Sequence, residues 1–275
     1  MFRKIINVMH IQNLPFTKWL LSAVVISCLL AACQKKNSKE FTSWQLYRGD
    51  EGGNAYSQLN QINRGNVKQL KIAWIYHSGN KAPDYSSLET SPIIIHDVLY
   101  GISPDLKTFA LDAKTGKELW NFDPFANSKG GGVCRGLTFW ESGDDQRIFM
   151  FASNKLIALD AKTGKQIMNF GDSGFTDLNK GLRANGGIEH HEDVGNTSPG
   201  VIYKNLIITG SAVSEDYESS PGHIRAYDVS TGKMKWIFHT IPEPGEFGYN
   251  TWQKDSYKTV GGCNAWSGLS IDSKR

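Results

Sequence analysis

Three segments of this chain follow one frame, and this recurrence constrains the fold more than any other feature of the sequence. The frame reads Ala-x-Asp-x-x-Thr-Gly-Lys and begins at Ala110, Ala158 and Ala226, with apolar stretches before the Asp and after the Lys. Asp accepts hydrogen bonds from nearby backbone N–H groups and Gly adopts positive φ, so each copy predicts a strand, a tight turn and a strand. Repeats of about 40–50 residues built from short strands are typical of β-propeller blades.

Two further positions of the frame suit stacked sheets. The alanine of each copy is small, which would let a neighbouring sheet approach closely. Trp120 and Trp236 lie four residues after the glycine, where a large ring would fill the gap between adjacent sheets, and Met168 takes that place in the second copy. Three ordinary hairpins in a β-sandwich are the alternative, and the shared frame disfavours it.

The frame divides the chain into units. An N-terminal segment, 44–79, is expected to end in one strand at 71–79. Units follow at residues 90–122, 136–170 and 198–239, and a fourth opens at 263–272. The polar stretch 171–196 is too long for a simple connection and is a candidate for the functional face. A closed ring of eight blades needs roughly twice this length, so the expected fold is an all-β propeller truncated to about three and a half blades.

The first residues predict a targeting segment. Residues 1–32 have a basic start, an apolar run at 19–30 and a small-residue end, which is typical of a secretory signal and too short for a comfortable membrane span. The sequence Leu-Ala-Ala-Cys, ending at Cys33, resembles a bacterial lipobox, in which the cysteine is lipidated. Residues 33–43 then form a polar tether. By this resemblance the chain is anchored on the periplasmic side of a bacterial membrane, the outer membrane rather than the inner; a plain signal peptide is the alternative.

The net charge says little about partners once this segment is set aside. The chain has 30 Lys and Arg against 27 Asp and Glu, and three of the cations lie in residues 1–32, which leaves 27 against 27. A balanced body without a basic stripe argues against nucleic acid as a partner. Cys134 and Cys263 lie in different repeats, and no pairing between them is predicted although an oxidising compartment permits disulfides.

The repeat resembles the tryptophan-docking motif of quinoprotein dehydrogenases, eight-bladed propellers that bind pyrroloquinoline quinone (PQQ). The resemblance covers the N-terminal part of that family and residues 44–275 of this chain. The stretches "PGHIRAYDVSTGK" (221–233) and "HTIPEPGEFGYNTW" (239–252) resemble its glucose dehydrogenase branch. The implied fold is an eight-bladed quinoprotein-type β-propeller.

The resemblance also implies a cofactor site. PQQ is a flat ortho-quinone with three carboxylates, so its site requires cations, N–H donors and a flat platform. The positions that match the family's cofactor contacts are Glu89, Cys134, Arg135, Thr197, Ser211, Ala212 and Trp266. Glu215, with Asp216 beside it, matches a ligand of Ca²⁺ or Mg²⁺, hard cations that prefer carboxylate oxygen. The alternatives are an exposed acid at Glu89, a surface cation at Arg135 and a sheet-docking ring at Trp266.

Two departures from the family limit the transfer. The catalytic aspartate of the family lies in later blades, so the base is expected beyond Arg275 and the chain is expected to be a fragment without it. Residues 130–133 are Gly-Gly-Gly-Val, where the family often has a cysteine or a histidine.

The implied activity is oxidation of an aldose, glucose to gluconolactone above all, with electrons passed to ubiquinone or a cytochrome. The alternatives are a PQQ-dependent alcohol or polyol dehydrogenase, a sugar- or alcohol-binding sensor with a dead site, and a propeller lipoprotein without cofactor that scaffolds outer-membrane assembly.

Overall fold

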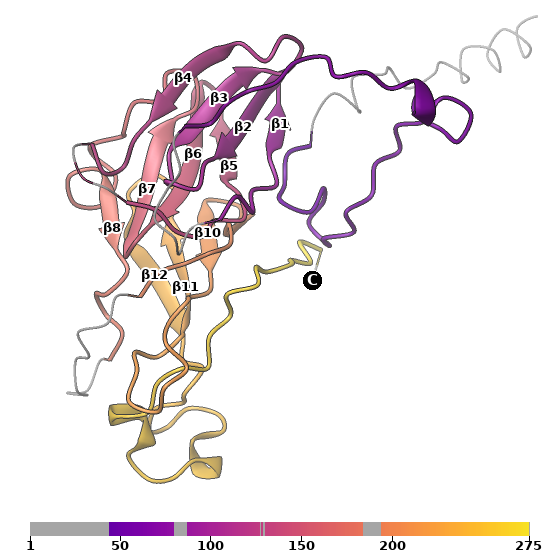
Figure 1. Cartoon of the computed structure of the whole chain (residues 1–275). Helices are drawn as coiled ribbons and strands as arrows, with labels where there is room; N and C mark the ends of the chain where they lie inside the picture. The colour runs from indigo at the N-terminus through magenta and orange to yellow at the C-terminus, as the bar shows by residue number, and fades with distance from the viewer. Residues whose placement is uncertain (1–43, 80–86, 127, 129, 184–193, 275) are drawn as a thin grey trace, which may run out of the picture. The chain divides into compact units, whose positions relative to one another are not determined.

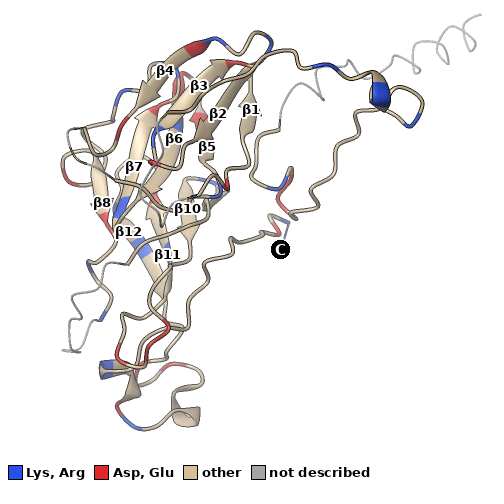
Figure 2. Ribbon diagram, viewed as in Figure 1, with Lys and Arg blue, Asp and Glu red and all other residues tan. Residues whose placement is uncertain are grey.

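The computed structural model of the chain describes residues 44–79, 87–126, 128, 130–183 and 194–274. They all belong to one compact unit, Phe41–Arg275. Figure 2 shows basic and acidic residues interspersed along the ribbon of this unit.

Twelve strands form three four-stranded antiparallel sheets, each with its strands in chain order (Figure 1). Sheet 1 contains β1 (Ile93–Ile95), β2 (Val98–Ile102), β3 (Thr108–Asp112) and β4 (Glu118–Phe122). Sheet 2 contains β5 (Thr138–Ser142), β6 (Asp145–Ala152), β7 (Lys155–Asp160) and β8 (Phe175–Asp177). Sheet 3 contains β9 (Val201–Tyr203), β10 (Leu206–Thr209), β11 (Ile224–Asp228) and β12 (Met234–Phe238). The only helices in the described residues are the single 3₁₀ turns η2 (Val67–Gln69), η3 (Tyr249–Thr251) and η4 (Ser256–Lys258). The all-β fold of four-stranded blades is confirmed.

The repeated frame forms the predicted turn in all three sheets. Asp112 Oδ1 accepts hydrogen bonds from the Thr115 N–H and hydroxyl, at 2.7 and 2.6 Å. Asp160 and Asp228 receive the same pair of bonds from Thr163 and Thr231. The glycines that close the three turns have φ of +70°, +69° and +70°, a region that only glycine adopts without strain.

Tryptophan rings join the first sheets as the frame predicts. Trp120, on β4, donates its indole N–H to the Ala161 carbonyl of sheet 2 at 3.0 Å, and Trp74 donates to the matching Ala113 carbonyl of sheet 1 at 3.2 Å. Each ring lies on the glycine of the turn that it meets: a Cβ added to Gly116 or Gly164 would come within 2.5 Å of the ring. The glycine is therefore needed for its contact as well as for its φ.

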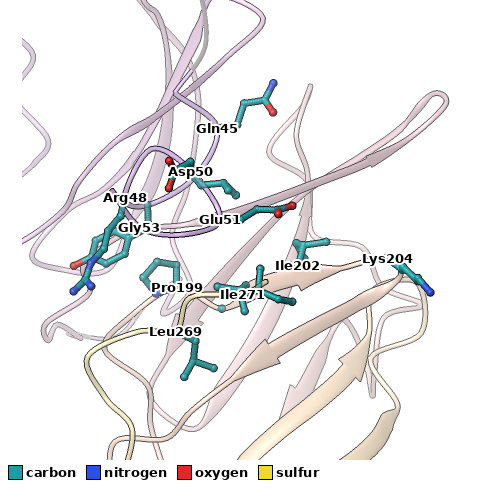
Figure 3. Close-up of a pocket in the computed structure, with 14 residues that line it drawn as sticks. Gln45, Arg48, Asp50, Glu51, Gly53, Pro199, Ile202, Lys204, Leu269 and Ile271 are labelled. Carbon is teal, nitrogen blue, oxygen red and sulfur yellow. The ribbon is translucent and has the colours of Figure 1, made fainter. Parts of the chain in front are cut away.

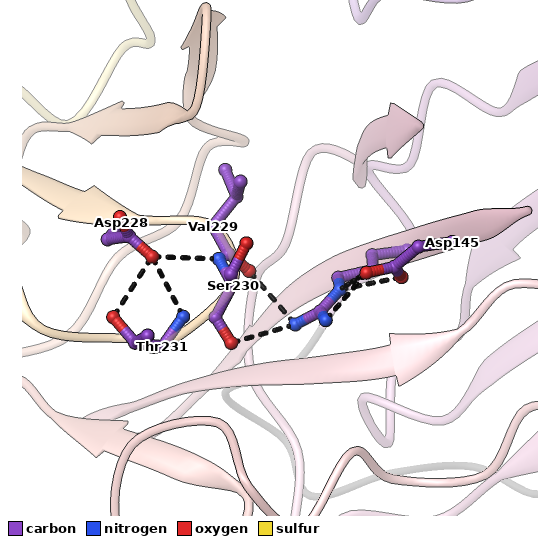
Figure 4. Close-up of polar contacts among 6 residues, drawn as sticks. Asp145, Asp228, Val229, Ser230 and Thr231 are labelled. Atoms are coloured by element: carbon purple, nitrogen blue, oxygen red, sulfur yellow. Dashed lines mark hydrogen bonds and ion pairs between the residues drawn. The ribbon is translucent and has the colours of Figure 1, made fainter. Parts of the chain in front are cut away.

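The prediction that Met168 takes the place of the docking ring in the second copy is wrong. Met168 is 62% exposed. Its place is taken by Arg147 of β6, whose Nη1 donates to the Val229 and Ser230 carbonyls at 3.1 Å each; the two bonds are the dashed lines to the labelled Val229 and Ser230 in Figure 4. Val229 occupies the position of Ala113 and Ala161 in the frame, so a guanidinium here makes the bond that an indole makes elsewhere.

The outermost strand of sheet 2 also lies outside its expected unit. The predicted unit ended at 170, but β8 lies within the stretch assigned to a loop, and Asp177 pairs with Lys155. After the frame the chain makes a single bridge, Leu159 to Gln166, and then turns through Gly171 and Gly174, both at positive φ. These glycines return the chain to the edge of β7, which the residues just after the frame leave unpaired.

One other predicted strand does not form, and the fourth unit predicted to open at 263–272 begins without a strand. Residues 71–79 carry the docked Trp74, but no strand of the described residues pairs with them. Residues 263–272 form no strand either. Their last part runs beside the N-terminal segment, where the Ile271 N–H donates to the Glu51 carbonyl at 3.0 Å. A strand requires a continuous ladder of backbone hydrogen bonds to a neighbour, and the described residues supply none to these segments.

The sheets pack face to face through two apolar cores. Ile148 and Met150 of β6 point into the core shared with sheet 1, while Phe149 and Phe151 point into the core shared with sheet 3. Side chains alternate between the faces of a strand, so burial on both faces explains the unbroken apolar run of β6. The three frame alanines are fully buried, and Ala110 and Ala158 lie in the cores between sheets as predicted.

Candidate functional site

Three of the predicted cofactor residues contact a fourth, Arg135. Its Nη2 lies 3.1 Å from Glu89 Oε2, and its Nη1 donates to Thr197 Oγ1 at 2.8 Å. The guanidinium carbon lies 5.0 Å from the centre of the Trp266 ring, within range of a cation–π contact. The structure therefore brings Glu89, Arg135, Thr197 and Trp266 into one network.

The network is built from the residues that lead into the first strand of each sheet. The Ser91 N–H donates to the Arg135 carbonyl, and the Arg135 N–H donates to the Thr197 carbonyl, both at 2.8 Å. The three lead-in segments are thus hydrogen-bonded in tandem. The sequence repeats Thr-Ser-Pro in two of them, at 90–92 and 197–199, and the proline restricts the residue before it to an extended conformation.

The backbone of Trp266 is fixed by hydrogen bonds to its carbonyl and by close packing of the residues before it. Its carbonyl accepts hydrogen bonds from Thr197 Oγ1 at 3.2 Å and from Ser198 Oγ at 2.7 Å. The residues before it pass close to two glycines, because a Cβ on Gly210 would overlap the Ala265 carbonyl and one on Gly222 would overlap Asn264. The indole remains 44% exposed, so part of its surface is available to a ligand.

Cys134, Ser211 and Ala212 do not join this network through their side chains. Cys134 is buried in the core between sheets 1 and 2, and this burial raises the pKa of its thiol to about 11. The Ser211 hydroxyl is buried and donates to the His223 carbonyl at 2.8 Å. Ala212 exchanges two backbone hydrogen bonds with Gly195. Any contact of these residues with a ligand would use their backbone.

The predicted metal ligands lie on an exposed loop after β10. Glu215 and Asp216 are both exposed, and Asp216 Oδ2 accepts a hydrogen bond from the Ser214 hydroxyl at 2.6 Å. Among the described residues no three His, Cys, Asp or Glu side chains lie close enough together to hold an ion. The loop offers carboxylate oxygens, the ligand type that Ca²⁺ and Mg²⁺ prefer, but supplies only part of a coordination shell.

The chemistry of the Arg135 network fits a flat anion. The guanidinium side chain is 21% exposed and presents donors in a planar fork beside an exposed aromatic face. Such a pair can bind a carboxylate through charge-assisted hydrogen bonds and a conjugated ring by stacking. Glu89 offsets part of the positive charge and fixes the orientation of the fork. PQQ combines a flat ring system with carboxylates, so these residues fit the group.

Two residues of the site escaped the sequence analysis. Ser198 holds the Trp266 carbonyl, and Asn196 Oδ1 accepts the Ser198 N–H at 3.0 Å while its amide donates to Thr209. The repeated Thr-Ser-Pro motif was the signal for Ser198, since it marks the same place in two lead-in segments.

A cavity of about 290 Å³ lies beside the third lead-in segment, and none of the predicted site residues lines it. Figure 3 shows Pro199, Ile202, Leu269 and Ile271 around it, with the charged side chains of Arg48, Asp50, Glu51 and Lys204 nearby. It is bounded by the N-terminal segment, the lead-in and β9 of sheet 3, and residues 269–271. The cavity is thus separate from the four residues that meet at Arg135.

Comparison with known proteins gives the family. Residues 44–275 match the family model described as the β-propeller domain of PQQ-dependent glucose, ethanol and alcohol dehydrogenases. The chain belongs to this family.

Curated members of this quinoprotein family are similar along most of the chain. Quinoprotein glucose dehydrogenase of Gluconobacter oxydans is 32% identical over 233 residues, which is 74% of this chain and 28% of that protein. Quinoprotein glucose dehydrogenase A of Acinetobacter calcoaceticus is 29% identical, over 85% of this chain and 32% of that protein. The chain therefore spans about a third of the length of these relatives.

Solved structures of the family share the fold. Quinohemoprotein alcohol dehydrogenase ADHIIG of Pseudomonas putida HK5 superposes with a TM-score of 0.66 at 25% identity, over 85% of this chain and 33% of that one. A europium-containing methanol dehydrogenase superposes with a TM-score of 0.61 at 24% identity, over 86% of this chain and 41% of that one. The three sheets thus correspond to part of a quinoprotein propeller.

Proposed function

We propose that this chain contributes part of the cofactor site of a PQQ-dependent dehydrogenase that oxidises an aldose, with glucose as the first candidate and gluconolactone as its product. Two observations support the substrate: the glucose dehydrogenases among the relatives, and the resemblance of residues 221–233 and 239–252 to that branch. The electrons pass to a quinone acceptor, ubiquinone, with a cytochrome as the alternative. PQQ, when bound, would accept the two electrons of the oxidation as a hydride.

The convergence on Arg135 carries the proposal. A surface arginine has no need of a carboxylate, a hydroxyl and an exposed indole arranged around it, whereas a site for a flat polycarboxylate does. Arg135 donates to a cofactor carboxylate or quinone oxygen, Trp266 supplies the stacking surface, and Glu89 orients the guanidinium. Thr197 adds a hydroxyl beside them. Cys134, Ser211 and Ala212 complete the wall with backbone groups.

Glu215 and Asp216 are the proposed ligands of Ca²⁺ or Mg²⁺. Both carboxylates are exposed and free of salt bridges to described residues. A divalent ion there would polarise a carbonyl of the cofactor and balance its charge.

Binding of PQQ tests the function. PQQ should quench the tryptophan fluorescence of the chain as it binds. Arg135→Gln should weaken binding about tenfold or more, since a charge-assisted hydrogen bond is worth about 1.5–3 kcal/mol. Arg64→Gln, which removes an exposed cation of the N-terminal segment, should bind as the wild type does. Equal affinities for Arg135→Gln and the wild type would contradict the assignment.

A PQQ-dependent alcohol or polyol dehydrogenase is the second candidate, favoured by relatives such as the dehydrogenase subunit of the quinone-linked alcohol dehydrogenase of Acetobacter aceti, 28% identical. Dye-linked oxidation of glucose against ethanol and glycerol separates the two, measured on a PQQ-loaded protein that includes the catalytic aspartate of the family, since residues 1–275 are expected to be inactive without it. A folded protein without affinity for PQQ would instead favour the assembly scaffold.

We also propose a lipid anchor at Cys33 that holds the protein on the periplasmic side of a bacterial membrane, the outer one in preference to the inner. Support comes from the lipobox-like Leu-Ala-Ala-Cys, with residues 1–32 as signal and 33–43 as tether; these lie outside the described residues. No helix of the described part is long and apolar enough to cross a membrane. Labelling with a fatty-acid probe should disappear in Cys33→Ser, and persistent labelling would refute the anchor.

A further inference from the structure

Two adjacent hydroxyl groups donate to one carbonyl at the cofactor site. Ser198 Oγ lies 2.7 Å from the Trp266 oxygen and Thr197 Oγ1 lies 3.2 Å from the same atom. A carbonyl oxygen has two lone pairs and accepts both bonds. The platform tryptophan is therefore held twice, by neighbours that lie 69 and 68 residues before it in the chain.

The two hydroxyls differ in what else they do. Thr197 Oγ1 also accepts a bond from Arg135, and Thr197 is only half-buried, at the face where the guanidinium and the indole meet. Ser198 is 1% exposed, and its own N–H is fixed by Asn196. One hydroxyl thus faces the ligand side and the other is enclosed in the protein.

A hydroxyl has a single proton to donate. If Thr197 donates it to an anionic ligand lying on the indole, the bond to the Trp266 carbonyl is lost. The Ser198 hydroxyl cannot make this exchange, because it is buried in the protein. It also donates the shorter of the two hydrogen bonds to the Trp266 carbonyl. The carbonyl then keeps one donor.

We propose that Ser198 is the positioning residue that holds Trp266 in place, while the Thr197 hydroxyl can give up its bond to the Trp266 carbonyl and donate to the cofactor instead. This inference rests on the proposed function, since the exchange needs an anionic ligand at the indole. The stacking surface stays in place because its anchor is not one of the groups that bind the ligand.

Fluorine NMR tests the anchor in the absence of any cofactor. The chain has 8 tryptophans, so the protein is labelled with 5-fluorotryptophan and the resonance of Trp266 is assigned from Trp266→Phe. Ser198→Ala should shift and broaden that resonance and leave those of Trp74 and Trp120, which dock on other turns, in place. Thr197→Val should leave it within its linewidth, because the Ser198 bond remains.

Ser256→Ala is the matched control. Its hydroxyl is also buried and donates to a backbone carbonyl, that of Gln253, at the same 2.7 Å. It should leave the Trp266 resonance unchanged, and Ser198→Cys, which keeps the size and a weak donor, serves if Ser198→Ala does not fold. An unchanged Trp266 resonance in the folded Ser198 variant, or an equal shift in Thr197→Val, would overturn the assignment.

Titration with PQQ separates this inference from the function it rests on. Ser198→Ala should raise the Kd for PQQ about three- to tenfold, the usual effect of one lost hydrogen bond. Ser256→Ala leaves the contacts of Trp266 intact and should bind PQQ as the wild type does. A wild type that does not bind PQQ refutes the proposed function, while the NMR result still decides whether Ser198 anchors the indole. A wild type that binds, with a Ser198→Ala variant of equal affinity, refutes the positioning role.

Discussion

Asp112 shows how one carboxylate of the repeat frame organises its turn. A single oxygen accepts both the hydroxyl and the N–H of Thr115. These bonds hold the pKa of Asp112 below its usual range, with the Thr115 hydroxyl as the larger cause and the Thr115 N–H next. For Asp228, burial acts to raise the pKa, but the bonds from Thr231 and Ser230 outweigh it and the net shift is again downward. The turns are therefore stabilised by the ionised aspartate.

The lowered pKa values of Asp112 and Asp228 predict a dependence of stability on pH. A carboxyl whose pKa is lowered by folding stabilises the protein above its unfolded pKa of about 3.9, and this contribution is lost as pH falls through the lower folded value. Asp112→Asn keeps an acceptor oxygen but cannot titrate, so its melting temperature should fall less than that of the wild type between pH 5 and pH 3, in thermal unfolding followed by circular dichroism. Asp144→Asn, in the exposed turn before β6, should follow the wild type. If the melting temperature of Asp112→Asn fell as steeply as that of the wild type, the turn carboxylate would not contribute to the pH dependence of stability.

Sequence alone located the local part of the site but not its long-range contacts. The Asp–Thr bonds span three residues and follow from turn chemistry. The four residues around Arg135 were found through the family resemblance, because their motifs lie far apart in the sequence. Ser198 was missed because its role depends on a carbonyl 68 residues away, and Arg147 was missed because its acceptor lies 82 residues away. No local pattern encodes such pairs.

The sheets are joined by contacts that need not be alike. Trp74 and Trp120 bond to equivalent carbonyls of the next turn, whereas Arg147 makes the third such bond with its charge balanced by Asp145 at 2.8 Å. Gly232, which has no ring above it, is instead covered by the backbone of Gly171 and the hydroxyl of Thr176. This exchange explains why β8 was misplaced from the sequence: the residues after the second frame cover the turn of sheet 3 before they return to sheet 2.

The docking of a ring on a glycine predicts a large difference between two glycine substitutions. Gly164→Ala adds a Cβ at φ +69° that would come within 2.5 Å of Trp120, while Gly143→Ala has φ +60° and no atom within 4 Å. Gly143→Ala should cost about 1 kcal/mol for its backbone alone. Gly164→Ala should cost at least about twice that, because the Trp120 ring must also move. Urea unfolding of both variants measures the difference in the free energy of unfolding. Equal midpoints would show that contact with the Trp120 ring adds nothing to the cost of the substitution.

At the scale of the whole molecule, one face of the last strand is open. Trp236 and Phe238 alternate along β12 on this face and are 40% and 60% exposed, while a bulge pairs Met234 with Tyr227, which lies in the core shared with sheet 2. The frame predicted Trp236 as a docking ring, and no turn glycine of the described residues lies under it. Large apolar side chains side by side on an edge strand favour association.

The open face predicts concentration-dependent self-association of the chain. Phe238→Lys should lower it, as measured by sedimentation velocity over a range of concentrations, with little change in melting temperature because the residue is exposed. Phe247→Lys is the comparison, since Phe247 is fully exposed but lies in a loop rather than on the strand. If both variants associate as the wild type does, the β12 face is not the contact.

The alternation of β6 has a consequence for how the chain finds its register while folding. Aliphatic side chains at 148 and 150 fill one core, and aromatic rings at 149 and 151 fill the other. In a strand with one buried face, a slip of one residue exposes apolar groups to water. Within residues 148–151 the same slip keeps apolar groups buried and instead exchanges rings for aliphatic groups in both cores, so that Phe149 and Phe151 would have to fit beside Ile95 and Leu159. Over these four residues the correct pairing of sheet 2 is therefore selected by side-chain size, and substitutions that even out the sizes remove the information that distinguishes the native pairing from its neighbour.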